Sequence, residues 1–155
     1  MGDQLVDFLR SRNAQSHHAD IDWQSKKDAW VRSVDALYGT IEEMLRDSIA
    51  AGDVALRRFD VQVTEDFIGE YTIPALELRV GGERVEFRPK GVNVIGAAGR
   101  VDLRGERDTV TLVKGKADAN GEWAVVLQRV PSLKMAPLDR ESLTRALEQA
   151  MLPLP

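Results

Sequence analysis

The chain has 155 residues, of which 43% are hydrophobic and 30% charged, a net charge of −4 and no cysteine. Such values are ordinary for a folded protein, and the length suits a single domain, residues 1–155, with its own core. The lack of cysteine excludes disulfides and thiol nucleophiles and disfavours structural zinc. Because no run of about 18 apolar residues and no secretory signal pattern occurs, we expect a cytoplasmic protein without a membrane span.

A short helix over residues 3–12 is predicted at the N-terminus. Leu5, Phe8 and Leu9 recur at helical spacing, and the Asp3 carboxylate can cap the first turn. The polar residues 11–19 are expected to form a connection to the next element.

The rest of the chain is organised around a long helix expected over residues 20–51. Its apolar residues recur with the 3.6-residue period of a helix that lies on a core, and they are Trp30, Val34, Leu37, Ile41, Met44 and Leu45. The first turns, with Trp23, extend beyond this stripe, so we expect them to overhang the sheet or to pack on the short helix. Gly39 predicts a bend or a close approach, because glycine costs about 1 kcal/mol in a helix. Gly52 suits a left-handed helix end.

After Gly52 the hydrophobic period changes from 3.6 to 2, which predicts strands joined by short turns. The predicted strands are residues 58–63, 71–80, 84–88, 92–95, 100–104, 109–114 and 122–130. Residues 92–95 are a short apolar run, and residues 122–130 are more continuously apolar, as in an interior strand. Gly81-Gly82 predicts a hairpin turn, and Pro89 is expected to end a strand or to lie at a sheet edge. Such short connections require antiparallel pairing, with one buried and one solvated face.

A last helix is predicted from Asp139, because Leu143, Ala146, Leu147, Ala150 and Met151 form an apolar stripe and Leu138 can pack on Leu143 as a hydrophobic staple. The expected fold is therefore α+β. An antiparallel, twisted sheet of about five or six strands carries the long N-terminal helix and the C-terminal helix on one face.

No catalytic residue, metal site or cofactor site is predicted. His17 and His18, the only histidines, are adjacent on a polar stretch and lack the spacing of a metal pair. Gly96 and Gly99 favour a tight bend or bulge, because no helix follows them to form a phosphate site.

Two alternative functions remain open. Asp60, Glu86 and Asp102 could converge on the polar sheet face as enzyme carboxylates, but their arginine neighbours favour cross-strand ion pairs. Residues 84–116 carry eight basic and four acidic residues, which would suit nucleic acid. The scarcity of exposed aromatic residues and the overall acidity argue against that second alternative.

The predicted function is non-catalytic protein binding, as in an inhibitor, immunity-type or adaptor protein. Residues 1–53 carry ten acidic and six basic residues, so the outer face of the long helix is expected to dock a basic protein partner. The predicted partner-binding residues are Trp23, Asp28, Asp35, Glu42 and Glu43. Two alternatives bury the overhang: the N-terminal helix folds back on Trp23, or two overhangs pair in a homodimer.

Overall fold

The computed structural model describes residues 3–66, 68–92, 99–115 and 122–153, and their side chains except those of residues 14–22. The helices are α1 (Gln4–Met44), α2 (Arg46–Ala50) and α3 (Arg140–Ala150). The strands are β1 (Ala55–Glu65), β2 (Gly69–Val80), β3 (Glu83–Gly91), β4 (Gly99–Arg104), β5 (Thr109–Lys114), β6 (Trp123–Gln128) and β7 (Lys134–Pro137).

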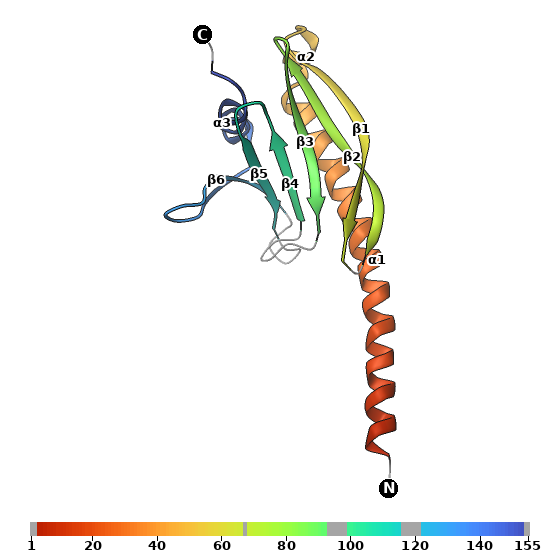
Figure 1. Ribbon diagram of the computed structural model, residues 1–155. Helices are drawn as coiled ribbons and strands as arrows, with labels where there is room; N and C mark the ends of the chain where they lie inside the picture. Colours follow the sequence, from red (N-terminus) through yellow and green to blue (C-terminus); the bar gives the residue numbers. More distant parts are fainter. Residues whose placement is uncertain (1–2, 67, 93–98, 116–121, 154–155) are drawn as a thin grey trace.

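The seven strands form one antiparallel sheet in the order β1-β2-β3-β4-β5-β6-β7. Helices α1 and α3 lie against one face, and α1 passes behind β1 and β2 in Figure 1. This confirms the predicted α+β fold, with slightly more strands than expected. The strand that the sequence did not predict is β7, whose four residues are too few to establish an alternating pattern. Most of the short strand expected at residues 92–95 lies outside the described residues.

Turns and helix ends follow the local sequence closely. Gly81 and Gly82 both have positive φ, +58° and +87°, in the β2–β3 hairpin, as the two-residue turn requires. Gly52 has φ +81° just after α2. Asp139 caps α3 by accepting a hydrogen bond of 2.8 Å from the Ser142 N–H. These three predictions are confirmed.

Helix α1 differs from the prediction because it is one continuous element of 41 residues. The expected connection at residues 11–19 is wrong, and so is the expected helix start near residue 20. Residues 3–38 contain neither proline nor glycine, so nothing in this stretch breaks the backbone hydrogen-bonding pattern. Asp3 does cap the helix, accepting a hydrogen bond of 3.1 Å from the Leu5 N–H. Figure 1 shows the first half of α1 projecting beyond the sheet.

The predicted core stripe of α1 is confirmed from Trp30 onward. Trp30, Val34, Leu37, Tyr38 and Ile41 are at most 2% exposed and join the core of the sheet. In the same core, Leu143, Ala146 and Ala150 anchor α3. Met44 and Leu45, the last residues of the predicted stripe, are partly buried and pack against this core, although α1 stops at Met44 and the chain restarts as α2. No described atom lies within 4 Å of a Cβ built at Gly39, through which α1 continues without interruption.

Pro89 does not end its strand, contrary to the prediction. Strand β3 continues to Gly91, and Pro89 is paired with Val101 of β4. The described β2–β3 pairing stops at Phe87, so on that side no ladder bond needs the missing proline N–H. Past Phe87, where the described pairing of β2 and β3 has ended, the Glu65 carboxylate of β1 links β2 to the residue after β3. It accepts hydrogen bonds from the Tyr71 hydroxyl and, at 2.9 Å, from the Val92 N–H.

Candidate functional site

The first candidate surface is the projecting segment, defined as residues 4–26 of α1. Its tip exposes four apolar side chains, with exposed fractions of 64% for Leu5, 39% for Val6, 55% for Phe8 and 55% for Leu9. About five helical turns separate Leu5 from Trp23, and about five more separate Trp23 from the buried Ile41, so the three side chains lie on the same side of α1. The exposed apolar residues therefore continue the core stripe of α1 past the end of the sheet. The fold-back predicted as one alternative does not occur.

Trp23, a predicted partner-binding residue, lies where the projecting segment approaches the sheet. Its side chain is half-buried, and the Lys26 Nζ lies 4.8 Å from the centroid of its ring. This cation–π contact covers part of the ring within the chain itself. Trp23 is thus half-buried, and its role in partner binding stays a prediction.

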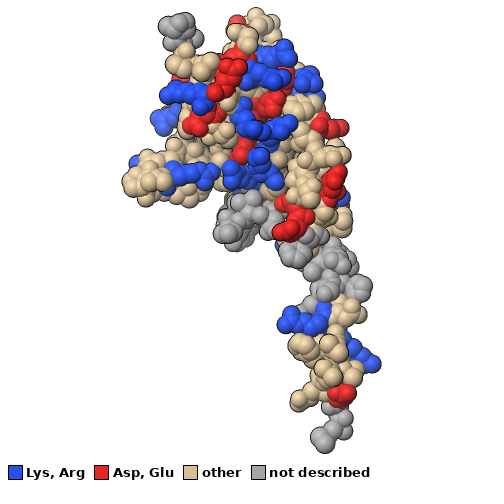
Figure 2. Space-filling model, in the orientation of Figure 1, with Lys and Arg blue, Asp and Glu red and all other residues tan. Residues whose placement is uncertain are grey.

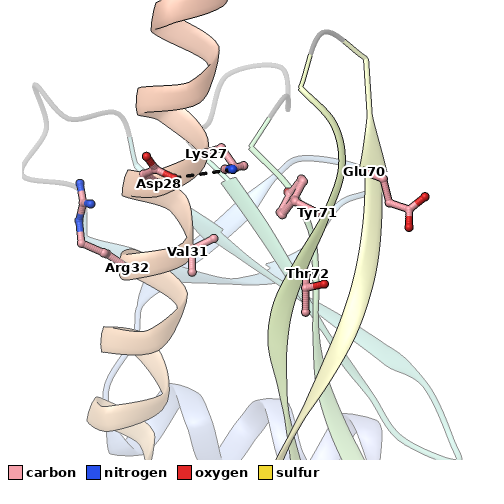
Figure 3. A pocket seen from close by; sticks show the side chains of 7 residues that line it. All are labelled: Lys27, Asp28, Val31, Arg32, Glu70, Tyr71 and Thr72. Carbon is pink, nitrogen blue, oxygen red and sulfur yellow. Dashed lines mark ion pairs between the residues drawn. The ribbon is translucent and has the colours of Figure 1, made fainter.

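A groove of about 490 Å³ lies between α1 and β2 near Asp28. Its lining residues, shown in Figure 3, are Lys27, Asp28, Val31, Arg32, Glu70, Tyr71 and Thr72. Asp28 pairs with Lys27 at 3.8 Å, while Glu70 points away from the helix. Burial and the hydrogen bond to Glu65 raise the pKa of Tyr71, so its hydroxyl stays protonated at neutral pH. With its two carboxylates apart, the groove does not present a pair suited to general acid–base catalysis.

The acidic face of α1 is less free than the sequence suggested. Arg58 of β1 pairs with both Asp35 and Glu42, at 3.0 Å for Glu42, and Glu43 pairs with Arg46. Asp28 is paired with Lys27, its neighbour on α1, and Glu42 with Arg58 of the sheet. Three of the four predicted carboxylates are thus engaged by arginines, which reduces the acidic field on this side of the molecule.

The second candidate surface is the arginine face, on the side of the sheet opposite α1 and α3. Figure 2 shows Lys and Arg side chains in a band across the sheet, with Asp and Glu among them. By alternation and register around Glu77 and Asp102, its charged strand residues are Arg57, Glu77, Arg79, Arg84, Glu86, Arg88, Arg100, Asp102 and Arg104. Arg129, which follows β6, joins them by donating a hydrogen bond from its Nη2 to the hydroxyl of Thr111, the residue paired with Asp102. Seven arginines therefore accompany three carboxylates on this face.

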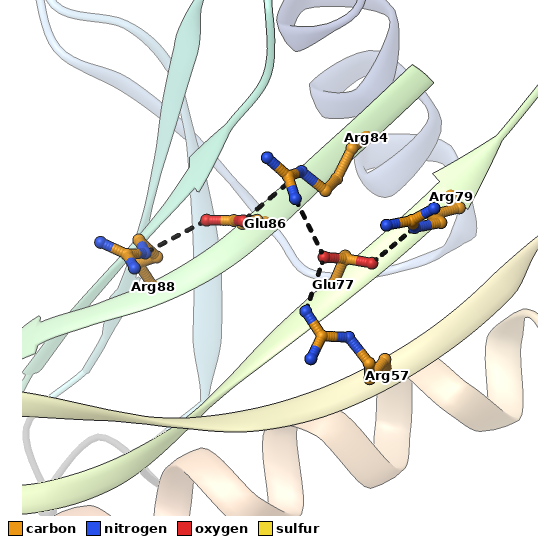
Figure 4. Close-up of polar contacts among 6 residues, drawn as sticks. All are labelled: Arg57, Glu77, Arg79, Arg84, Glu86 and Arg88. Carbon is orange, nitrogen blue, oxygen red and sulfur yellow. Dashed lines mark hydrogen bonds and ion pairs between the residues drawn. The ribbon is translucent and has the colours of Figure 1, made fainter. Parts of the chain in front are cut away.

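Glu77 is the centre of the arginine face, and its side chain is only 2% exposed. Its carboxylate lies 2.8 Å from Arg79 Nε, 3.0 Å from Arg57 Nη2 and 3.6 Å from Arg84 Nη1. Figure 4 shows the three arginines around this carboxylate. Hydrogen bonds from Arg79 and Arg57 lower the pKa of Glu77 from 4.5 to about 2. A carboxylate with so low a pKa is a weak base at neutral pH, which argues against a general-base role.

The other two carboxylates of this face are also held by arginines. Glu86 pairs with Arg88 at 3.2 Å and with Arg84 at 3.7 Å, and Asp102 pairs with Arg100 at 2.8 Å. Glu86 and Asp102 are thus ion-paired as expected, but with arginines two residues away on their own strands and not across strands, as the sequence had suggested. Asp60, the third carboxylate of the enzyme alternative, is paired with Pro74 and alternates to the opposite face of β1 from Arg57. The carboxylate group of that alternative therefore does not assemble on one face.

In the described part of the chain, no group of three or more His, Asp or Glu residues could hold a metal ion. The side chains of His17 and His18 and the glycine turn at residues 96–98 lie outside the described residues. None of the described helices is long and apolar enough to cross a membrane.

The fold and these surfaces define an α+β domain with a projecting helix and an arginine-rich open sheet face. The chain matches no protein-family model, no curated protein and no solved structure.

Proposed function

We propose that this protein is a non-catalytic protein-binding module that contacts its partner through the projecting segment. The observation that carries the proposal is the exposed apolar tip of α1, where Leu5, Phe8 and Leu9 are 55–64% exposed. Most helices in proteins are stabilised by packing of their apolar face rather than by intrinsic propensity. A partner that covers this tip would supply the packing that the sheet supplies to the rest of α1.

Trp23 extends the apolar surface toward the sheet, and Asp28 follows it on the outer face of α1. Trp23 offers a large ring at the margin of the contact, where aromatic residues often contribute most to binding. Asp28, with 61% of its side chain exposed, is the predicted carboxylate best placed to meet a basic group. The partner chemistry we propose is therefore an apolar groove with a basic rim. Asp35, Glu42 and Glu43 would contribute only where the partner displaces Arg58 or Arg46.

A triple substitution tests this proposal: Leu5→Gln, Phe8→Gln and Leu9→Gln in the full chain. Glutamine keeps the helix propensity and the charge while removing the apolar surface. The matched control is Asp7→Gln with Arg10→Gln, which changes two polar positions of the same turns without altering the net charge. The partner is first captured from the native host with the wild-type chain and then purified for calorimetry.

We expect the apolar triple variant to weaken binding by at least about tenfold, and the control by less than about twofold. Equal affinity for wild type and triple variant would show that the tip is not a contact. Sedimentation of the wild-type chain without its partner shows whether the chain is a monomer or, as the homodimer alternative requires, a dimer. A dimer that the triple variant converts to monomer would make a second copy the partner.

A further inference from the structure

The arginine face has more positive charge than its own carboxylates neutralise. This face carries seven arginines and only three carboxylates, Glu77, Glu86 and Asp102, whereas the whole chain has a net charge of −4. The positive surplus is therefore local, and the remainder of the molecule is more acidic than the total suggests. Such a charge distribution steers an anionic ligand to one face and keeps it away from the others.

The register of the sheet places like charges opposite one another. Arg79 of β2 is directly opposite Arg84 of β3, and like charges in that position destabilise a sheet. Glu77 bridges the two, but its contact with Arg84 is the longer, at 3.6 Å against 2.8 Å for Arg79. An additional anion over this pair would relieve the remaining repulsion.

The arginines also keep unused hydrogen-bond donors. A guanidinium has five N–H donors, yet Arg79 gives only its Nε to Glu77, with 64% of the side chain exposed. Arg57 gives one Nη nitrogen and is 60% exposed. Arg104 is exposed and forms no ion pair with any residue that the structure describes. Several guanidinium groups thus have free N–H donors with which to bind a carboxylate or phosphate by two hydrogen bonds.

The surroundings of the arginine face favour a protein ligand over nucleic acid. Phe59, a ring on the β1 part of this face, is flanked by Arg57 at 5.1 Å and Arg88 at 5.9 Å, so it is not a free stacking platform for bases. At the other end of the sheet, Leu133 is 60% and Met135 51% exposed. Met135 is paired with Val126 and by alternation lies on the arginine face.

From this combination we propose that the arginine face binds an acidic segment of a protein partner, with glutamate or aspartate side chains over β2–β4 and apolar side chains toward β7. The proposal goes beyond the binding function of the projecting segment, because it concerns the opposite face of the sheet. It does not depend on that function.

The test measures binding of a fluorescein-labelled oligoglutamate peptide by fluorescence anisotropy. Arg104→Glu is the first variant, because Arg104 takes part in no described ion pair and its loss leaves the network around Glu77 intact. Arg84→Glu with Arg104→Glu is the stronger variant. The matched control is Arg46→Glu with Arg145→Glu, which changes the net charge equally on helices α2 and α3, at side chains that are 70% and 60% exposed. Circular dichroism confirms that each variant is folded.

We expect the wild-type chain and the control to bind the peptide alike, with an affinity that falls as salt rises to about 0.15 M. Arg104→Glu should weaken binding by about threefold or more, and the double variant by about tenfold or more. The triple variant at Leu5, Phe8 and Leu9 should bind the peptide as wild type does, because the arginine face is intact in it. Failure of the arginine-face proposal can thus be distinguished from failure of the proposal that the projecting segment binds a partner.

Three results would overturn the proposal. The first is no measurable peptide binding at low salt. The second is an equal loss of peptide affinity in the Arg84→Glu, Arg104→Glu double variant and in the control, which would show that only the net charge matters. The third is tighter binding of a single-stranded or duplex oligonucleotide than of the peptide, together with a loss of that binding in the Arg84→Glu, Arg104→Glu double variant. That result would make the ligand a nucleic acid.

Discussion

Replacing Trp30 by alanine should remove the main anchor between α1 and the sheet. Trp30 is 2% exposed, and its ring lies 5.8 Å from that of Trp123, tilted by 37°. A Cβ built at Gly99 would lie 2.1 Å from the Trp30 Cζ3, so the ring packs directly on the backbone of β4. Because that backbone is held in the sheet, the cavity left by truncation cannot close fully.

A buried tryptophan replaced by alanine loses both its transfer free energy and the packing around the cavity, about 3–5 kcal/mol in total. For a chain of this size each kcal/mol corresponds to about 2–4 °C in Tm, so we expect a decrease of about 6–20 °C. Urea unfolding followed by far-UV circular dichroism gives the free energy, and calorimetry gives Tm.

Trp23→Ala is the internal control for this experiment. Trp23 is the same residue type on the same helix, but it is only half-buried, near the end of the projecting segment that adjoins the sheet. Its truncation should cost less than about 1 kcal/mol. A loss below about 1 kcal/mol for Trp30→Ala, or equal losses for the two variants, would refute the assignment of the core stripe.

Three further substitutions follow from the same structure. Gly99→Ala should cost about 1–3 kcal/mol in urea unfolding, because the new methyl group would overlap the Trp30 ring; an unchanged midpoint would contradict that packing. Gly39→Ala should instead stabilise by about 0.4–1 kcal/mol, since no described atom lies within 4 Å of the built Cβ, and destabilisation would restore the close approach expected from the sequence. Glu77 has its pKa lowered from 4.5 to about 2 in the fold, so its stabilising effect is complete above pH 4.5 and is lost as the pH falls toward 2. Glu77→Gln should therefore be less stable at neutral pH and lose less stability over that acid range, and a parallel pH dependence of the two proteins would show that Glu77 does not contribute.

The local sequence determined much of this fold. The 3.6-residue period placed the buried face of α1 from Trp30 onward, and the period of two placed most strands, because side-chain direction depends only on local backbone geometry. Gly81-Gly82 and Asp139 fixed a turn and a helix start for the same reason. The projecting segment was anticipated as an overhang, but its continuity through residues 11–19 was missed. Polar residues without proline or glycine can continue a helix as well as end it.

The tertiary structure decided which charges meet. Arg58 reaches Asp35 and Glu42 only because β1 lies beside α1, and nothing in the spacing of these residues along the chain indicates that contact. Likewise, Glu77 is buried beneath Arg57 and Arg84 because of the register of β1, β2 and β3. A shift of one residue in a strand would turn its side chains to the other face. Ion pairs between distant residues thus depend on register and packing, which the whole core sets, and not on the sequence around either partner.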